Sequence, residues 1–353
     1  MQSFVYTGQP ARVVFGAGCL AQLGPEIERL GARRALVLST PEQKAGAQEV
    51  AQLLGDRCAG LFDRAVMHVP IETARAARAE ATRLQADCAV AIGGGSTTGL
   101  GKAIALESSL PILAIPTTYA GSEMTPIYGI TEGGVKKTGR DPRVLPRTVL
   151  YDPTLTLTLP AQLSATSGMN AIAHAAEGLY AQDANPIMSL LAEEGIRALA
   201  HGLPNVVANP SNLEARGDCL YGAWLCGTVL GSVGMALHHK LCHTLGGTWN
   251  LPHAETHTIV LPHAMAYNER AAPDAMARIA RALNTRSAAL GLYGLAQRLK
   301  VPLALKDIGF PESAIDEAAR QAVTNPYYNP RPVKLEPIRE LLRRAWAGLA
   351  PAG

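Results

Sequence analysis

The sequence predicts an α/β N-terminal domain with a parallel nucleotide-binding sheet, followed by an all-α C-terminal domain. In the first half, short apolar runs that suit buried strands alternate with segments of helical spacing, which favours a parallel sheet with right-handed crossovers. In the second half, apolar residues recur at helical spacing throughout. A chain of 353 residues allows about two domains. With 48% hydrophobic and 17% charged residues, a large core is possible and global disorder is excluded.

The first expected strand is 13–15, which stops at a Gly-Ala-Gly turn before a helix over 21–30. The apolar run at 34–38 is a buried strand ended by Ser-Thr-Pro, and the Ala- and Arg-rich segment 72–85 has good helix propensity. Three further elements complete this half: strand 88–92, which runs into glycines, helix 97–106, and strand 112–115, which ends at a proline.

The second half contains helical spacing over 169–180, 186–200, 213–229 and 235–245. We therefore expect domains at 1–156 and 157–353, with the active site in the cleft between them, because ligand sites form preferentially at domain interfaces.

Charge and cysteine usage narrow the class of protein. The net charge of +3 comes from 32 basic and 29 acidic residues, a balance that argues against a nucleic-acid partner. The six cysteines form no CxxC pair, which is typical of reduced thiols in a cytoplasmic protein. The first 16 residues lack a basic segment followed by an apolar one, and no apolar run is long enough to cross a bilayer, so we expect neither a leader nor a membrane partner. A homodimer is the default expectation.

A glycine-rich loop follows the strand expected at 88–92. Glycines let a backbone approach a pyrophosphate closely, and the start of the next helix offers N–H groups and partial positive charge. The sequence therefore predicts a phosphate-binding loop, with a tight turn that binds nothing as the alternative; its residues are Gly93, Gly94, Gly95, Ser96 and Thr97.

Two other strand ends carry hydroxyl groups. Thr117, Thr118 and Ser122 follow the strand at 112–115, and the ends of neighbouring parallel strands face the same crevice. Ser39 and Thr40 follow the strand at 34–38, where an acidic residue often holds the ribose 2′-hydroxyl of NAD. No acidic residue directly follows this strand, so we expect both NADH and NADPH to bind. The alternative for each segment is an ordinary polar loop.

Six of the nine histidines lie between residues 238 and 263. His239 and His243 are four residues apart and share a helix face, and His253 follows a proline in an expected loop. Asn170 and His174 are likewise four apart. Imidazoles converging from these segments are typical of a divalent metal site. The alternative for any single histidine is a hydrogen-bonded structural residue.

At this point the sequence resembles the iron-containing alcohol dehydrogenase family over nearly its whole length. Within that family it resembles the subfamily that reduces the carbon–carbon double bond of maleylacetate to 3-oxoadipate in the catabolism of aromatic compounds. The motifs that carry the resemblance are Val14–Gly18, Gly93–Ser96, Pro116–Thr118, Gly121–Glu123, His239–Gly247, Pro252–His253 and Asn325–Arg331.

The departures from the family pattern concern the metal. Metal-dependent members use one Asp and three His; here His174, His239 and His253 fall on the histidine positions, and Asn170 falls on the Asp. The subfamily is implied to work without a bound metal. Because three neutral imidazoles cancel none of the charge of a divalent cation, we expect weak metal binding or none.

The resemblance also implies roles in the reaction. Hydride addition to the alkene carbon leaves an enolate, which must be stabilised and protonated. We expect His243 to donate the proton, His253 and His239 to donate hydrogen bonds to the enolate or a carboxylate, and His174 and Asn170 to orient them. Lys136 and Lys240 are candidates to bind the dianionic substrate, with solvated surface charges as the alternative.

Three other functions fit parts of the sequence. One is a metal-dependent alcohol or glycerol dehydrogenase of the same family that tolerates Asn170. Another is a lyase like dehydroquinate synthase, which shares this architecture and shows no net use of NADH. The last is a nucleotide-binding protein without catalysis, which the paired loops and the histidines disfavour.

Overall fold

The computed structural model describes residues 4, 6–8 and 11–352. The chain forms two compact units, one over Gly8–Leu159 and one that combines the residues before Gly8 with those from Pro160 onward, and each is described by itself. The ends of the two expected domains, at residues 1 and 353, lie outside the described residues, and so do residues 1–3, 5, 9 and 10 of the N-terminal segment in which no leader is expected.

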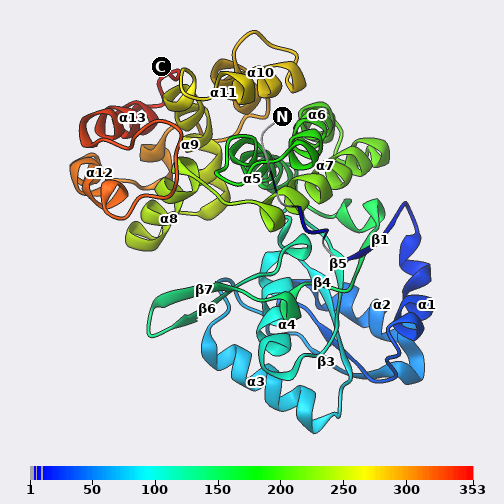
Figure 1. The fold of residues 1–353 in the computed structure, drawn as a ribbon. Helices are drawn as coiled ribbons and strands as arrows, with labels where there is room; N and C mark the ends of the chain where they lie inside the picture. The colour runs from blue at the N-terminus through cyan, green and yellow to red at the C-terminus, as the bar shows by residue number, and fades with distance from the viewer. Residues whose placement is uncertain (1–3, 5, 9–10, 353) are drawn as a thin grey trace. The chain divides into compact units, whose positions relative to one another are not determined.

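The first unit is built on a six-stranded parallel sheet with the order β1-β8-β5-β4-β2-β3 (Figure 1). The apolar run in β4 is buried over its full length, as expected for a central strand covered on both faces. The strands are β1 (Arg12–Phe15), β2 (Ala35–Leu38), β3 (Cys58–Phe62), β4 (Cys88–Gly93), β5 (Ile112–Pro116) and β8 (Thr148–Tyr151).

Two pairs of helices cover the faces of this sheet. Apolar residues of α1 (Leu23–Arg29) and α2 (Lys44–Leu54) share one buried cluster with the strands. Apolar residues of α3 (Ile71–Arg83) and α4 (Gly95–Ser108) share another cluster that includes Leu36, Leu38 and Phe62. Successive strand residues point to opposite faces, so alternate residues of β2 belong to the two clusters.

An antiparallel hairpin of β6 (Ile127–Glu132) and β7 (Val135–Arg140) projects from this unit (Figure 1). It was not predicted, and neither were β3, β8 and α2. The residues of β7 are almost all exposed, so the strand lacks the alternation of apolar and polar residues that marks a half-buried strand.

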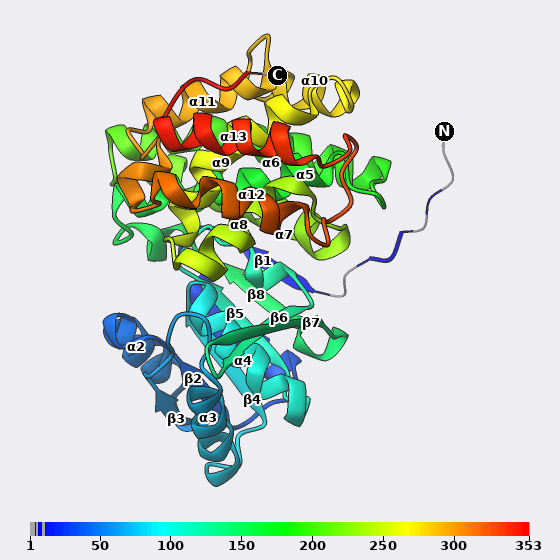
Figure 2. The ribbon, with the colours of Figure 1, turned by 90° about the vertical axis from the view of Figure 1, so that its left-hand side faces the viewer.

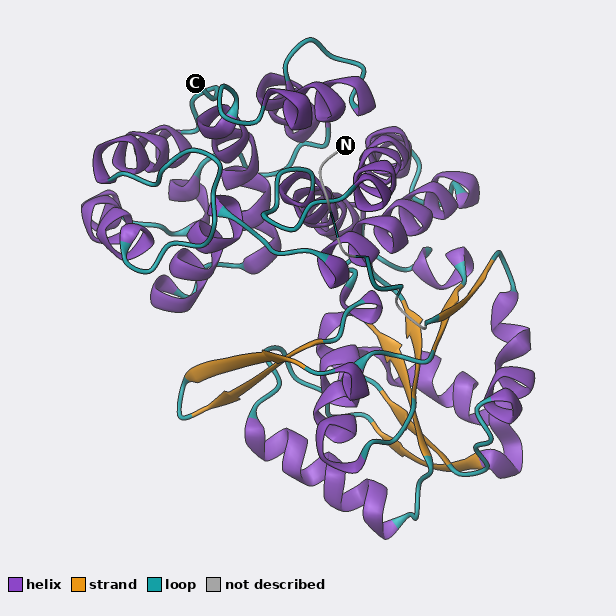
Figure 3. Cartoon of the chain, in the orientation of Figure 1, coloured by secondary structure: helices purple, strands orange, loops and turns teal. Residues whose placement is uncertain are grey.

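Over residues 160–352 the described secondary structure is helical, in contrast to the sheet-containing unit (Figure 3). The predicted fold class is therefore confirmed. The α-helices are α5 (Ala161–Gly178), α6 (Pro186–Ala208), α7 (Leu213–Ser232), α8 (Leu237–Trp249), α9 (His253–Asn268), α10 (Pro273–Ala282), α11 (Ala288–Arg298), α12 (Ile315–Val323) and α13 (Leu335–Ala347).

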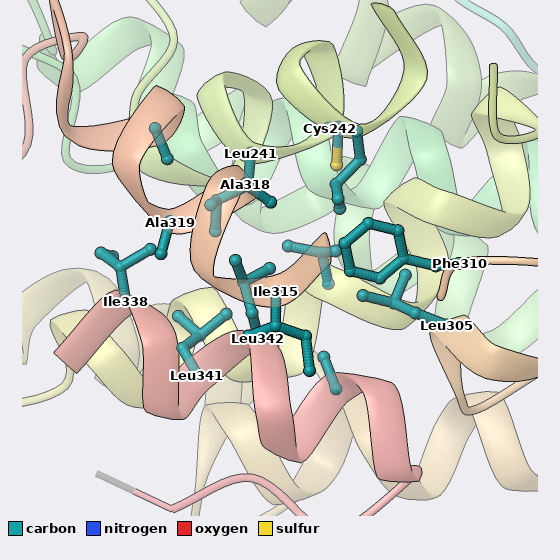
Figure 4. Packing of buried hydrophobic residues seen from close by; sticks show 14 of the residues in the cluster. Leu241, Cys242, Leu305, Phe310, Ile315, Ala318, Ala319, Ile338, Leu341 and Leu342 are labelled. Carbon is teal, nitrogen blue, oxygen red and sulfur yellow. The ribbon is translucent and has the colours of Figure 1, made fainter. Parts of the chain in front are cut away.

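One core of the helical unit joins α8, α9, α12 and α13, and α12 and α13 lie side by side (Figure 2). Phe310, Ile315 and Leu342 pack together at its centre (Figure 4). Among the described helices, no single one is long and apolar enough to cross a membrane. The bent pair α7 and α8 together has that length and apolar content, but the buried core helices of other proteins have it too. All six cysteines are free thiols, as predicted.

Candidate active site

The turn between β4 and α4 brings backbone close to side chains of neighbouring loops. Gly93 has a φ of 145°, and a Cβ on it would lie 2.6 Å from Oγ1 of Thr97. A Cβ on Gly94, the N-cap of α4, would lie 3.0 Å from Cγ2 of Thr118. Gly93 therefore requires glycine, a side chain on Gly94 would crowd Thr118, and the first N–H groups of α4 are left without partners in the helix. A helix start of this kind is suited to bind a phosphate.

The two predicted nucleotide loops are neighbours in the sheet. β4 pairs with β5, so that Gly93 stands beside Pro116, and Thr117 N–H donates to the Gly93 carbonyl at 3.1 Å. Gln43 Nε2 donates to Thr117 Oγ1 at 2.6 Å and ties the turn after β2 to the same place. The sequence did not indicate Gln43, because a contact between residues so far apart in the chain leaves no local pattern.

The hydroxyl groups expected to bind the cofactor differ in exposure. Ser39 and Thr97 are fully buried, and their hydroxyl oxygens have no hydrogen-bond partner in the described part of the chain. Thr117 is buried, whereas Thr40, Ser96, Thr118 and Ser122 are partly exposed. The groups that a bound phosphate can reach are therefore those of the backbone of the glycine turn, where Gly95 is exposed and Ser96 is partly exposed.

Glu42 lies nearer the turn after β2 than the sequence suggested. A hydrogen bond from its own backbone N–H, together with one from the Thr40 side chain, lowers the pKa of the Glu42 carboxyl. Although Glu42 does not directly follow the strand, its carboxylate therefore stands beside Thr40, where a negative charge disfavours the 2′-phosphate of NADPH.

Lys102 is a buried cation of α4 that sequence reasoning missed. Its Nζ donates to the carbonyls of Ser122 and Ile127, both at 2.7 Å, and to the carbonyl of Thr125 at 2.8 Å. Desolvation lowers the pKa of Lys102 to about 7, against the attraction of Glu123. Lys102 thus anchors the loop after β5. Its position as the one charged residue in the otherwise apolar segment 100–106 could have indicated a buried lysine.

The histidines of the helical unit gather from three helices. Asn170 and His174 come from α5, His239 from α8, and His253 and His257 from α9. The ring centroids of His174 and His239 are 5.2 Å apart, those of His239 and His257 are 4.9 Å apart, and those of His253 and His257 are 4.1 Å apart. The structure therefore brings the rings of His174, His239 and His253 together around His257, an unpredicted member, while Asn170 lies one helical turn before His174 on α5.

Glu177 organises the cluster from α5, one helical turn beyond His174. Its Oε1 accepts from the backbone N–H of His238 at 2.7 Å, and its Oε2 accepts from that of Ala236 at 2.8 Å. Oε2 also lies 2.7 Å from Nδ1 of His239. These N–H groups belong to the start of α8, where a helix leaves donors unpaired. The carboxylate thus caps α8 and orients His239 at once.

The contact with Glu177 defines which nitrogen of His239 carries the proton. Burial and the nearby His243 and His253 lower the pKa of His239, so the ring is neutral near pH 7. A neutral ring that donates Nδ1–H to a carboxylate presents a lone pair at Nε2. His239 is therefore arranged to accept a hydrogen bond, whereas we had expected it to donate one to the enolate.

Several polar atoms of the cluster are buried but unsatisfied. Oδ1 of Asn170, Nδ1 of His174, Nε2 of His239 and both ring nitrogens of His257 have no hydrogen-bond partner among the described residues. Burial also lowers the pKa of His174 and His257, so these rings are neutral. Unpaired buried polar groups are costly, so these atoms suit a polar partner that the protein itself does not supply.

The imidazoles offer a divalent metal a set of neutral ligands. In the described part of the chain, the three ligand nitrogens that lie within 4.8 Å of one another come from His238, His239 and His257, and not from the family set of His174, His239 and His253. His238 Nε2 is already 2.9 Å from the carbonyl oxygen of His257. Asn170 adds a neutral oxygen, so no charged ligand balances a cation.

Exposed residues border the cluster. Nδ1 of His243 lies 3.0 Å from the Tyr327 hydroxyl, and Lys240 Nζ lies 5.9 Å from the centre of the Tyr327 ring. Tyr327 belongs to the segment 325–331, one of the motifs that resemble the family, for which no role was predicted. Lys136 is an exposed residue of β7 in the other unit.

Comparisons with known proteins agree with these features. Residues 10–153 match the model of iron-containing alcohol dehydrogenases, and residues 164–346 match that of the C-terminal part of the same family. A maleylacetate reductase of Burkholderia cepacia is 64% identical over 352 residues, which is 100% of both chains. The crystal structure of maleylacetate reductase from Agrobacterium tumefaciens has a TM-score of 0.97 and 54% identity, covering 99% of this chain and 100% of that one. That from Rhizobium sp. strain MTP-10005 has a TM-score of 0.97 and 55% identity, with the same coverage. The chain belongs to the iron-containing alcohol dehydrogenase family.

Proposed function

We propose that this protein reduces the carbon–carbon double bond of maleylacetate to give 3-oxoadipate, with NADH or NADPH as the reductant. The full-length identity of 64% to a maleylacetate reductase supports this substrate. The structural observation that carries the proposal is the buried amide of Asn170 beside the neutral His174 and His239, at the position where metal-dependent members of the family are expected to carry an Asp.

Asn170 suits a dianionic substrate better than Asp would. An Asp carboxylate only accepts hydrogen bonds and repels a second anion, whereas an amide offers two N–H donors beside one acceptor. Asn170 is buried, so its donors act in a medium of low polarity, where they stabilise a developing negative charge most strongly. We infer that the Asn170 amide donates to the enolate oxygen that forms from the ketone.

The neutral histidines complement that donor. His239 presents a lone pair at Nε2 and can accept from a hydroxyl group or a water molecule. Its orientation comes from Glu177 at 2.7 Å, so His239 keeps its tautomer during the reaction. His174 and His257 occupy the space beside it, and His174 acts as a positioning residue.

Protonation of the enolate carbon completes the reduction. His243 is our candidate donor, since it is exposed and its Nδ1 lies 3.0 Å from the Tyr327 hydroxyl, which holds the ring in one orientation. A histidine with access to solvent can be protonated again after each turnover. Lys240 lies beside Tyr327 and provides a positive charge for a substrate carboxylate.

The glycine turn after β4 and the loop after β5 are proposed to hold the cofactor. Their close approach at Gly94 and Thr118 leaves room for backbone contacts with a pyrophosphate but not for an added side chain. When bound, NADH or NADPH supplies the hydride to the alkene carbon β to the ketone. We also propose that the working form is a homodimer, which light scattering would establish.

A turnover assay tests the proposal directly. The purified protein is mixed with maleylacetate and NADH, and both NADH oxidation and the formation of 3-oxoadipate are followed. We expect equimolar consumption of the two substrates, which persists after chelation.

The same preparation is tested for the other functions. Oxidation of alcohols or glycerol with NAD⁺, without reduction of maleylacetate, would assign it to alcohol dehydrogenation. Turnover of a dehydroquinate synthase substrate without net NADH use would assign a lyase.

A further inference from the structure

A cavity lies in the helical unit, away from the residues assigned above. Its volume is about 220 Å³, and it is bordered by His263 and Tyr267 of α9, by Arg331, and by Leu341 and Arg344 of α13. Figure 4 shows α13 with Leu341 beside the core that α8, α12 and α13 share. Neither the predicted nucleotide loops nor the histidines around His239 contribute to this cavity.

Two polar side chains of the cavity have unused hydrogen-bonding capacity. His263 is 3% exposed, and neither of its ring nitrogens has a partner within the described residues. Arg344 donates through Nη2 to the Ala350 carbonyl at 2.6 Å, whereas its Nε is buried and unpaired with respect to the described chain. Buried polar groups without a partner lose their hydrogen bonds to water on folding, so these atoms favour an added polar ligand.

The charges at the cavity select an anion. Arg331 is held in place because its Nη1 donates to the Tyr267 carbonyl at 2.9 Å and its guanidinium lies 4.2 Å from the centre of the Tyr267 ring. Glu340 also borders the cavity, but its carboxylate is paired with Arg343 at 2.8 Å. Two guanidinium groups therefore remain opposite one neutralised carboxylate.

The state of His263 adds a directional contact. Burial and the neighbouring Arg344 lower the pKa of His263 to about 4, so the ring is neutral near pH 7. A neutral imidazole has one donor and one acceptor nitrogen. It can donate to an anionic oxygen without requiring a second negative charge on the ligand.

We propose that this cavity binds a small organic carboxylate, with Arg344 and Arg331 holding the carboxylate and His263 donating to one of its oxygens. Pro337 and Leu341 supply an apolar wall for the body of the ligand. An engineered apolar cavity of about 150 Å³ accommodates benzene, so a space of this size takes a ligand with a single ring. The bidentate geometry of a guanidinium matches a carboxylate.

Calorimetric titration of the full chain with benzoate tests the proposal. We expect saturable binding that is at least about tenfold weaker in Arg344→Met, which removes one guanidinium (a loss of about 1.4 kcal/mol). Arg320→Met is the matched control, since it removes the same charge from an exposed side chain of α12 that does not border the cavity, and it should bind as the wild type does. Benzyl alcohol, which has the ring but no charge, should not bind.

A second variant tests the cavity by filling it, without a change in charge. Ala352 borders the cavity and is exposed, so Ala352→Trp should fill the space and abolish benzoate binding while the melting temperature stays near that of the wild type. Turnover of maleylacetate should be unchanged in both variants, which separates this site from the one proposed for catalysis.

Three results would overturn the proposal. The first is an absence of saturable benzoate binding to the wild type. The second is an equal loss of binding in Arg320→Met and Arg344→Met. The third is inorganic phosphate binding as tightly as benzoate, which would show an unselective anion site.

Discussion

The carboxylate of Glu177 lies 2.7 Å from Nδ1 of His239, although 62 residues separate the two in the sequence. The same carboxylate accepts the backbone N–H groups of Ala236 and His238 at the start of α8. We predict that Glu177→Gln lowers kcat for maleylacetate by about 10–100-fold, the usual effect of removing the group that orients a site histidine. The KM for NADH should change little.

The melting temperature of Glu177→Gln should fall as well, because an amide nitrogen cannot accept the N–H groups of α8. Glu194→Gln is the control, since Glu194 pairs with Arg197 on α6 at 2.7 Å near the surface. A Glu177→Gln variant with the activity of the wild type would show that His239 needs no fixed tautomer.

The proton donor is tested at His243. Its replacement by alanine should lower kcat by about 10²–10⁴-fold, the usual contribution of general acid catalysis, and leave the KM for NADH nearly unchanged. Tyr327→Phe removes the hydroxyl 3.0 Å from Nδ1 and should cause a smaller loss, because the imidazole remains. His201→Ala, on the exposed face of α6, is the control. Full activity of His243→Ala would transfer the role to His253.

The metal is tested at Asn170. The purified protein should keep its activity after exhaustive chelation. Asn170→Asp should bind zinc more tightly in calorimetry, since it adds a charged ligand beside neutral imidazoles, and it should lower turnover, since a carboxylate there repels a dianionic substrate. Asn205→Asp, exposed on α6, should do neither. Activity lost on chelation and restored by iron or zinc would assign the protein to the metal-dependent branch of the family.

Cofactor choice is tested at the turn after β2. Thr40→Asp should reduce kcat/KM for NADPH far more than for NADH, because a carboxylate repels the 2′-phosphate. Glu42→Gln removes the carboxylate that accepts from the Thr40 side chain and should shift the ratio towards NADPH. Glu49→Gln, exposed on α2, should leave the ratio unchanged. If both cofactors respond equally to Thr40→Asp, the ribose does not bind at this turn.

Stability should fall as the pH is lowered from about 6.5 to about 4. His263 has its pKa lowered to about 4 in the folded protein, against an ordinary value of 6.5, and burial lowers the pKa of His238 to about 4 as well. Within this range the unfolded chain binds protons that the folded chain does not, so each group costs up to about 3 kcal/mol of unfolding free energy at the acid end.

Urea denaturation at a series of pH values measures this slope. His263→Phe should make the dependence on pH shallower between 6.5 and 4, and His201→Phe, at an exposed position, should leave it unchanged. Equal slopes in the wild type and His263→Phe would show that His263 is not kept neutral by folding.

Local patterns in the sequence were sufficient for much of the fold. Examples are the apolar run that forms β4, the glycines after it and the helical spacing in the second half. Each of these patterns depends only on residues that are near one another in the chain. The hairpin of β6 and β7 was not predicted because β7 is almost wholly exposed and β6 is half-buried along most of its length, so neither strand alternates between buried apolar and exposed polar residues. Lys102 was missed because the carbonyls it binds lie 20–25 residues away in the chain.

Most residues of the histidine cluster could be predicted from the sequence alone, but their protonation and their hydrogen-bond partners could not. The spacing of four residues placed Asn170 and His174 on one helix face and His239 and His243 on another. Helical periodicity says nothing about which helices pack together, and only that packing places Glu177 of α5 at the start of α8 and His257 of α9 beside His239. The sequence by itself therefore determined which side chains are available, and the tertiary structure decided which nitrogen of His239 carries a proton, because that depends on a contact between residues distant in the chain.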